Sequence, residues 1–561
     1  MMNIDNLLNR AIQLHRQGAL SESREIYEQI LAELPTHAKV LNLLGATYIQ
    51  TGEHQKGLPF IEKALLVKPD FPEACNNRGI ILKGLGRYEE AISCYQNALV
   101  LNPNYALAYY NLGVVQEELK CHEEALASYQ RALAIKPDYV DAHINLGNLL
   151  KDARQLNEAA TSYRHALRLR PDNADVHTSL GFVLMLQNRL DEAEASLRKA
   201  LTLNPKDANT FFTLGNILKN TGRADEAHEM FRCAQQLRPL LTQPGKKREA
   251  DFSVLLLGSP IVACTPVEYL VGRAGYDSHF LALLPDVTYD IGFLRAKADV
   301  VINMISDADD RQDVLLLAQD IADQLGRPTV NHPRLVMGTD REAIAARLAG
   351  IARCRIPKTM RFSAQDLSGE KGRKCMEGFA MPLLIRCAGM HGGEDFEKID
   401  DVGAIDSFVS HHPDADIYVI EYVDYRSADG YFRKYRMLCV DGEILPYHLA
   451  IHDHWMVHHF RTDMANQEWM RKEEEAFLKH PYRIFTKAHM NALQEMASII
   501  GLDYFGIDCS LDREGNIVVF EANASMVIHD ESDAMFAYKN PYVRKIKEAF
   551  DTMLSRLAQS R

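Results

Sequence analysis

The stretch NYALAYYNLGVVQEELKCHEEALASYQRALAIKP, residues 104–137, is one copy of a 34-residue unit that recurs through the first part of the chain. Prolines stand 34 residues apart at Pro35, Pro69, Pro103, Pro137, Pro171, Pro205 and Pro239. Glycines keep the same period at Gly45, Gly79, Gly113, Gly147, Gly181 and Gly215. One of two alanine series runs through Ala91, Ala125, Ala159, Ala193 and Ala227. Proline, glycine and alanine series that share one period predict a repeat architecture.

Each unit has the composition of two helices joined by a turn. The proline ends the second helix, because it lacks an N–H and disfavours helix in the residue before it. The glycine and alanines allow close helix crossings, and larger side chains fill the space between units at Tyr95, Tyr129, Tyr163 and Phe231. This pattern resembles the tetratricopeptide repeat, whose period is about 34 residues. The resemblance implies seven units over residues 1–241, stacked as an all-α solenoid with a concave groove.

Asparagines gather around the repeat glycine, at first-helix positions that face the groove in tetratricopeptide repeats. A carboxamide both donates and accepts hydrogen bonds, so a row of them can hold an extended peptide backbone. The candidate partner-binding residues are Asn42, Asn76, Asn77, Asn111, Asn145, Asn148 and Asn216. A solvated helix face without a ligand is the alternative. Because such arrays are mostly interaction scaffolds, we expect a peptide or protein partner in the groove.

The second half of the chain has a different pattern. Residues 242–250, TQPGKKREA, are polar and turn-rich, which predicts a linker. Strands alternate with helices over residues 251–335, which predicts a small α/β domain with a parallel sheet. Residues 336–561 begin with a helix capped near Asp340 and continue with three strand–turn groups.

Two of these groups carry cations. Arg386 lies near the end of an apolar strand, and Gly389, Gly392 and Gly393 follow it. A cation beside a glycine loop can hold phosphate oxygens, although a glycine-rich hairpin with a surface arginine gives the same pattern. The second group, YFRKYRMLCV (residues 431–440), alternates so that Lys434 and Arg436 share one strand face. Two cations on one face need an anion or carboxylates opposite, unless that face is an exposed edge.

The third group pairs acids across a predicted hairpin. Asp508 lies in one strand and Glu521 in the next, thirteen residues later, so the two should be neighbours. Asn523, two residues beyond Glu521, faces the same side. Two carboxylates and an amide oxygen would suit Mg²⁺, which prefers oxygen ligands. A hairpin with surface acids is the alternative.

The order of these groups resembles the ATP-grasp superfamily, which includes the D-alanine–D-alanine ligase and the ribosomal-protein glutamate ligase. The resemblance implies a small α/β pre-ATP-grasp domain at 251–335 and an α+β ATP-grasp catalytic domain at 336–561, so that the chain is multidomain. It implies that Mg²⁺ is held by Asp508, Glu521 and Asn523. It implies that ATP is held by Arg341, Arg386, Gly389, Gly392, Gly393, Glu421, Tyr422, Val423, Lys434 and Arg436. The family usually has lysine where Arg341 and Arg386 stand, which affects the expectation of catalysis more than that of fold.

The activity implied is an ADP-forming ligase that needs ATP and Mg²⁺. It would phosphorylate a carboxylate and let an amine attack the acyl phosphate, with Arg386, Lys434 and Arg436 as catalytic cations. The repeat groove would recruit a peptide or protein substrate, and the carboxylate or amine could also be a small molecule. The alternatives are a non-catalytic scaffold with a degenerate nucleotide-binding domain, and a kinase-like phosphotransferase.

A run rich in histidine extends from His448 to His459 and includes His452 and His454. Imidazoles at such spacings can bind zinc. The alternatives are a wall of the substrate pocket, a plain surface, or a general base supplied by His452 or His454.

Composition limits the remaining possibilities. A net charge of −13 argues against general affinity for nucleic acid or anionic membranes. The N-terminal segment is polar, and no run reaches the roughly 18 apolar residues that a membrane span needs. The ten cysteines are scattered without a CxxC pair. We therefore expect a cytoplasmic protein.

Overall fold

The computed structural model describes residues 4–560, except for 247–249, 263, 266–267, 272–274, 310, 369–371, 373, 375, 390–394, 458–461 and 525. The chain divides into two compact units, Met1–Met230 and Phe231–Arg561. Among the described residues, no helix has the length and apolar character to cross a membrane.

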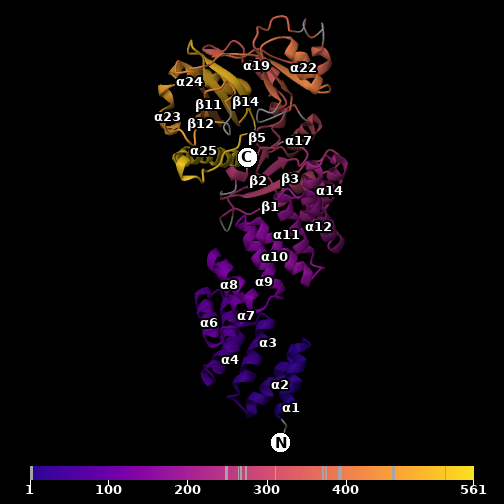
Figure 1. Ribbon diagram of the computed structural model, residues 1–561. Coiled ribbons are helices and arrows are strands. Elements are labelled where there is room, and N and C mark those ends of the chain that lie inside the picture. The colour runs from indigo at the N-terminus through magenta and orange to yellow at the C-terminus, as the bar shows by residue number, and fades with distance from the viewer. Residues whose placement is uncertain are drawn as a thin grey trace. The chain divides into compact units, whose positions relative to one another are not determined.

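The first unit consists of helices that follow one another in chain order (Figure 1). They are α1 (Ile4–Arg16), α2 (Leu20–Glu33), α3 (Ala38–Gln50), α4 (His54–Val67), α5 (Pro72–Gly84), α6 (Tyr88–Leu101), α7 (Ala106–Glu118), α8 (His122–Ile135), α9 (Val140–Asp152), α10 (Leu156–Leu169), α11 (Ala174–Leu186), α12 (Leu190–Leu203) and α13 (Ala208–Asn220). The last helix, α14 (Ala224–Leu237), begins in this unit and ends in the second.

The repeat positions have the predicted packing roles. Tyr129 is fully buried, and a Cβ built on Gly113 would lie 2.7 Å from its ring. Tyr163 has the same relation to Gly147, also at 2.7 Å. Helix α8 ends at Ile135, two residues before the repeat proline. The sequence prediction of paired helices in close contact at the glycine is therefore confirmed.

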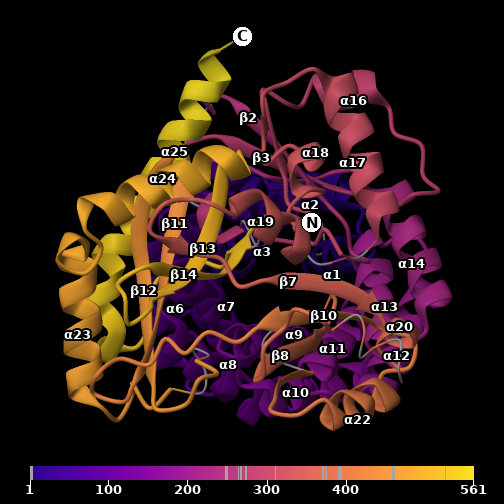
Figure 2. The same cartoon turned by 90° about the horizontal axis from the view of Figure 1, so that it is seen from above.

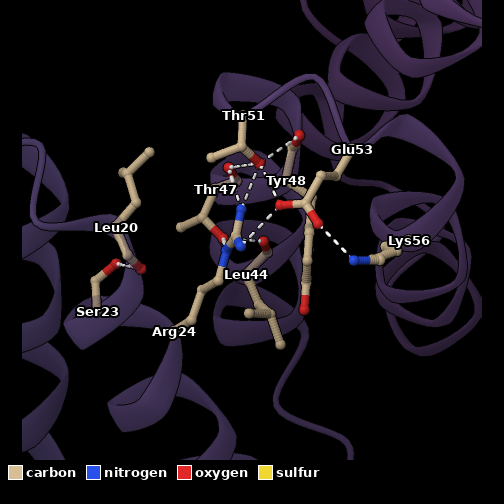
Figure 3. A network of polar contacts seen from close by, with 9 residues as sticks. All are labelled: Leu20, Ser23, Arg24, Leu44, Thr47, Tyr48, Thr51, Glu53 and Lys56. Carbon is tan, nitrogen blue, oxygen red and sulfur yellow. Dashed lines mark hydrogen bonds and ion pairs between the residues drawn. The ribbon is translucent and has the colours of Figure 1, made fainter.

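A polar network joins the first repeat to the second (Figure 3). Arg24 of α2 donates from Nε to Oγ1 of Thr47 and from Nη2 to the carbonyl of Thr47, each at 3.0 Å. It also pairs with Glu53 at 3.0 Å and lies 4.0 Å from the ring centroid of Tyr48. One arginine thus contacts the side chain and the carbonyl of Thr47 near the C-terminal end of α3, where basic side chains commonly bond the last carbonyls of a helix.

The described part of the second unit contains three sheets and the helices that accompany them. Their elements are β1 (Leu241–Gln243), β2 (Ser253–Gly258), α15 (Glu268–Val271), β3 (Asp277–Ala282), α16 (Ile291–Arg295), β4 (Val300–Asn303), α17 (Gln312–Leu325), β5 (Thr329–Val330), α18 (Pro333–Val336), α19 (Arg341–Leu348), β6 (Cys354–Arg355), β7 (Thr359–Ser363), α20 (Ala364–Leu367), β8 (Leu383–Cys387), β9 (Phe396–Ile399), α22 (Gly403–His411), β10 (Asp416–Glu421), β11 (Phe432–Val440), β12 (Glu443–His452), α23 (Glu468–Lys479), η2 (Pro481–Arg483), α24 (Lys487–Ile500), β13 (Tyr504–Leu511), β14 (Ile517–Asn523), η3 (Ala534–Lys539) and α25 (Asn540–Gln559).

The first sheet has the strand order β1-β3-β2-β4-β5. Strands β3, β2, β4 and β5 are parallel, as the alternation of strands and helices predicted, while β1 pairs antiparallel with β3 at the edge. The expected linker thus begins inside a strand, because Thr242 and Gln243 pair with β3. The helix expected after Asp340 is α19, and Asp340 caps it by accepting from the N–H of Ala343 at 2.8 Å.

The second sheet, β7-β10-β8-β9, is antiparallel throughout. One of its faces packs against α20 and α22 through a core that includes Ile385, Ile417, Val419 and Phe408. Figure 2 shows α20 and α22 beside these strands. The other face carries Arg386 and Tyr418, which lie opposite each other in the register.

The third sheet has the order β12-β11-β13-β14-β6. Asp441 and Gly442 form a tight hairpin between β11 and β12, with φ values of +49° and +80°. Tyr435, Met437 and Cys439 pack into the core that also holds α23 and α24. On the other face, Leu438 and Val440 pack with α25. Because side chains alternate along β11, Lys434 and Arg436 lie on that second face and are directed away from the core formed with α23 and α24.

Candidate functional site

One cavity of about 310 Å³ is lined by the second and third sheets and by the start of α19. Its volume lies at the lower end of the range of small-molecule sites. The described members of the nucleotide and metal sets predicted from sequence all line it: Arg341, Arg386, Gly389, Glu421, Tyr422, Val423, Lys434, Arg436, Asp508, Glu521 and Asn523. Gly392 and Gly393 lie outside the described residues. Residues up to 182 positions apart in the sequence, from Arg341 to Asn523, thus meet at one place.

Asp508 is the anion that the cations of β11 require. It lies opposite Arg436 in one neighbouring strand and opposite Glu521 in the other. Arg436 holds it with two hydrogen bonds of 2.7 and 2.9 Å, and Lys434 Nζ lies 2.8 Å from Oδ2. Burial alone would raise the pKa of this carboxyl, but Arg436 and Lys434 outweigh it and hold the pKa well below its usual range. Asp508 is therefore ionised at neutral pH.

Glu521 lies next to Asp508 across the β13–β14 hairpin, as the thirteen-residue spacing predicted. Nη2 of Arg341 donates to its Oε1 at 2.6 Å, and Nδ2 of Asn523 lies 3.5 Å from the same oxygen. Burial opposes ionisation, yet Arg341 is the main group that brings the pKa of Glu521 below its ordinary value. Two ionised carboxylates and an amide group consequently face one cavity.

Arg386 reaches the cavity from β8. Its side chain is buried, and its guanidinium carbon lies 5.5 Å from the ring centroid of Phe396. Burial, together with the nearby charge of Arg341, lowers the pKa of Arg386 to about 10. The group remains cationic at neutral pH, and its proximity to Arg341 concentrates positive charge in the cavity.

The segment from Glu421 to Val423 passes from β10 along the cavity wall. The Glu421 carboxylate accepts from Arg355 at 2.8 Å and from the backbone N–H of Lys358 at 3.2 Å. This side chain therefore ties β10 to the segment before β7.

Sequence reasoning missed Asp309 and Tyr418, which also line the cavity. Asp309 accepts from the Tyr418 hydroxyl at 2.7 Å and from Arg361 at 2.9 Å. Asp309 follows β4, at the carboxyl edge of a parallel sheet, where α/β proteins usually bind ligands. The position of Asp309 after this strand was the sequence signal that could have identified it as a site residue. Tyr418 gave none, because a strand tyrosine is ordinarily part of a core.

The asparagine row needs a correction. Asn76 is fully buried and Asn42 is 6% exposed, so neither can contact a peptide in a groove. Each accepts a hydrogen bond of 2.9 Å from the next repeat, Asn42 from Asn77 and Asn76 from Asn111. These side chains join neighbouring repeats. The partly exposed members Asn77, Asn111, Asn145, Asn148 and Asn216 stay candidates for partner contacts.

The described histidines of the predicted cluster do not converge. His448 is buried and contacts Glu474, while His452 Nδ1 accepts from the backbone N–H of His454 at 2.9 Å. Within the described part of the chain, no three ligating groups of this cluster lie close enough to share an ion. His458 and His459 lie outside the described residues.

Comparison with known proteins identifies the repeats. Tetratricopeptide-repeat models match residues 38–71, 144–208 and 196–229, and a TPR repeat model matches residues 81–120 and 122–153. No curated protein matches the chain. Roughly the first 230 residues are therefore a solenoid of tetratricopeptide repeats, and a region of mixed sheets follows.

Several solved structures are similar to part of the chain. One is YrrB, described as a TPR protein with an unusual peptide-binding site, at 24% identity over 32% of this chain and 92% of that one, with a TM-score of 0.31. A thermophilic TPR protein in Thermus thermophilus has 24% identity over 32% and 99%, with a TM-score of 0.29. PilF of Pseudomonas aeruginosa has 20% identity over 36% and 92%, with a TM-score of 0.33.

Proposed function

We propose that residues 251–561 are an ATP- and Mg²⁺-dependent carboxylate–amine ligase of the ATP-grasp kind, to which the repeats recruit a peptide or protein. The observation that carries this proposal is the composition of one cavity. It combines two ionised carboxylates and an amide on β13 and β14 with four cations: Arg341, Arg386, Lys434 and Arg436. Buried charges are costly unless they are paired, so charged side chains are a poor choice for filling a core. Their presence in this cavity therefore favours a ligand-binding role.

The oxygen donors fit Mg²⁺. Asp508, Glu521 and Asn523 offer carboxylate and amide oxygens, the ligands that this ion prefers, and both acids have lowered pKa values. When bound, the ion would neutralise charge on the phosphates of ATP. Three donors suit a metal whose remaining positions are filled by phosphate oxygens and water.

The chain's own residues would position the reactants and offset charge. A substrate carboxylate oxygen attacks the γ-phosphorus, and ADP leaves. The amine then attacks the carbonyl carbon of the acyl phosphate, and phosphate leaves. Lys434, Arg436 and Arg386 surround the space in which negative charge develops, and such fixed cations lower the barrier most where water is excluded.

A second candidate is a nucleotide-binding scaffold without catalysis. Arginine stands at 341 and 386, where the family usually has lysine, and Arg341 is committed to Glu521 at 2.6 Å. A guanidinium holds oxygens in a fixed fork, whereas an ammonium is a compact charge that follows a moving phosphoryl group more easily.

Hydroxylamine trapping tests the proposal without knowledge of the amine. Full-length protein is incubated with ATP, Mg²⁺, hydroxylamine and a panel of peptides and amino acids that carry free carboxylates. The ligase predicts ADP together with a hydroxamate of one carboxylate, both lost in Lys434→Met. A stable phosphorylated product would instead indicate a kinase. No nucleotide turnover with any member of a broad panel would favour the scaffold.

A further inference from the structure

A second group of metal-ligating side chains lies outside the cavity's acidic hairpin. It comprises Cys387, the last residue of β8, Asp395, directly before β9, and His412, the C-cap of α22. The Sγ, carboxylate and imidazole atoms of the three all lie within 4.8 Å of one another. His412 Nε2 is 3.7 Å from Oδ1 of Asp395. These residues come from three elements, so the convergence is a product of the fold.

The donor set has the chemistry of a zinc-type site. Thiolate, imidazole and carboxylate are the three ligand classes that bind Zn²⁺ in proteins. Ligands around a tetrahedral zinc ion lie roughly 3–4 Å apart, given metal–ligand distances of about 2.0–2.3 Å. The 3.7 Å between His412 and Asp395 lies within this range, and no separation in the group exceeds 4.8 Å.

The thiol of Cys387 packs in the apolar core of the second sheet, a role that by itself needs no cation. Cys387 is 4% exposed, and burial, followed by the charge of Asp395, raises the pKa of its thiol. A divalent ion between the two groups reverses this effect, because it favours the thiolate and neutralises the carboxylate. A bare thiol beside an Asp–His ion pair is the competing explanation, and it predicts no affinity for metal.

Two of the three donors are held in place by surrounding structure. Cys387 pairs with Ile417 of β10 in the sheet register. The ring of His412 packs against Phe408 of the same helical segment, with centroids 4.8 Å apart. Because two ligands are already held in place, metal binding costs less conformational entropy.

We propose that Cys387, Asp395 and His412 bind a zinc-type divalent cation. The ion joins the end of β8 to the start of β9 and to the end of α22. It thereby fixes the strand end that carries Arg386, one residue before the thiolate ligand. The site stands on its own contacts and does not depend on the proposed ligase activity.

Cobalt titration of the reduced, untagged full-length chain tests the site. Co²⁺ bound by a thiolate gives an intense charge-transfer band in the near ultraviolet, and tetrahedral ligation gives strong visible bands. We expect these bands to saturate at one equivalent and to disappear when Zn²⁺ is added. Cys387→Ser removes the charge-transfer band. His412→Gln and Asp395→Asn weaken cobalt affinity by more than about tenfold.

Two matched controls separate this site from other thiols and imidazoles. Cys439→Ser removes another buried thiol, in β11, and His452→Ala with His454→Ala removes two imidazoles of the histidine-rich run. Both controls keep the bands under the proposal. Circular dichroism checks that each variant is folded, and the partly exposed positions 395 and 412 provide the test if Cys387→Ser does not fold. Absence of the band in the wild type, or its survival in Cys387→Ser or in folded His412→Gln with unchanged affinity, overturns the proposal.

Discussion

At the scale of single residues, two buried carboxylates of the second unit, Asp508 and Glu474, are stabilised by different partners. Asp508 lines the cavity and is held by Arg436 and Lys434. Glu474 of α23 is fully buried away from the cavity and contacts His448. A buried charge is tolerated only when hydrogen bonds and opposite charges compensate its lost hydration. The two acids solve the same physical problem, Asp508 with cations that line the cavity and Glu474 with His448, Tyr538 and a backbone N–H away from it.

Glu474 provides a prediction about acid stability. Besides His448, it accepts from the N–H of Leu449 at 3.1 Å and from the Tyr538 hydroxyl at 2.5 Å. Burial opposes its ionisation, but His448 and the other partners lower the pKa of Glu474 to about 2 from 4.5. Because the folded pKa is depressed, the stabilisation is complete above pH 4.5 and is lost as the pH falls towards 2. Glu474→Gln should therefore lower the free energy of unfolding at pH 7 by about 1–3 kcal/mol, because buried donors lose a charged acceptor, and should show a flatter acid profile.

Urea unfolding at a series of pH values, followed by tryptophan fluorescence, checks this prediction. Both tryptophans, Trp455 and Trp469, lie in the second unit, so the signal reports on that unit. Glu475→Gln on the exposed face of the same helix is the control and should follow the wild-type profile. Parallel acid profiles for the wild type and Glu474→Gln would refute the assignment.

At the scale of helices and strands, most of the predicted structure came from two patterns. These are the 34-residue period of the repeats and the alternation of side chains along β11. The 34-residue period located the helices, because proline, glycine and a bulky residue recur where the packing requires them. The alternation along β11 predicted that Lys434 and Arg436 share one face, and in the structure both contact Asp508, whereas Tyr435 lies in the core on the other face. The asparagine row was less informative. Successive helical residues differ by about 100° in direction, so a shift of one position moves a side chain from the groove to the contact between repeats.

The repeat glycine gives a prediction at this scale. Gly113→Ala brings a Cβ to within 2.7 Å of the buried Tyr129 ring, which must move or strain the helix pair. We expect destabilisation of about 1–3 kcal/mol, although alanine favours helix more than glycine does. Far-UV circular dichroism during denaturation measures it. Asn97→Ala, on an exposed face of α6, should change stability little, and equal stability of wild type and Gly113→Ala would disprove the packing role.

At the scale of the second unit, the site could be predicted only in part. Short spacings, such as that between Asp508 and Glu521, translate into neighbours across a hairpin. The contact of Asp309 with Tyr418 joins residues 109 positions apart and depends on how the sheets pack, which no local pattern encodes. The family resemblance supplied the grouping of Arg341 with Glu521, which spacing alone could not supply. The tetratricopeptide repeats themselves were predictable from sequence because all their contacts are local or between neighbours.

The central claim is that this cavity holds ATP through a metal bound by Asp508, Glu521 and Asn523, and calorimetric titration of the full-length protein with ATP tests it most directly. The wild type should bind ATP in the micromolar range with Mg²⁺ and much more weakly with EDTA. Glu521→Ala with Asn523→Ala should abolish the metal-dependent part, whereas Glu514→Ala, an acid exposed at the turn of the same hairpin, should keep it. Metal-independent binding, or equal binding by the double variant, would contradict the account.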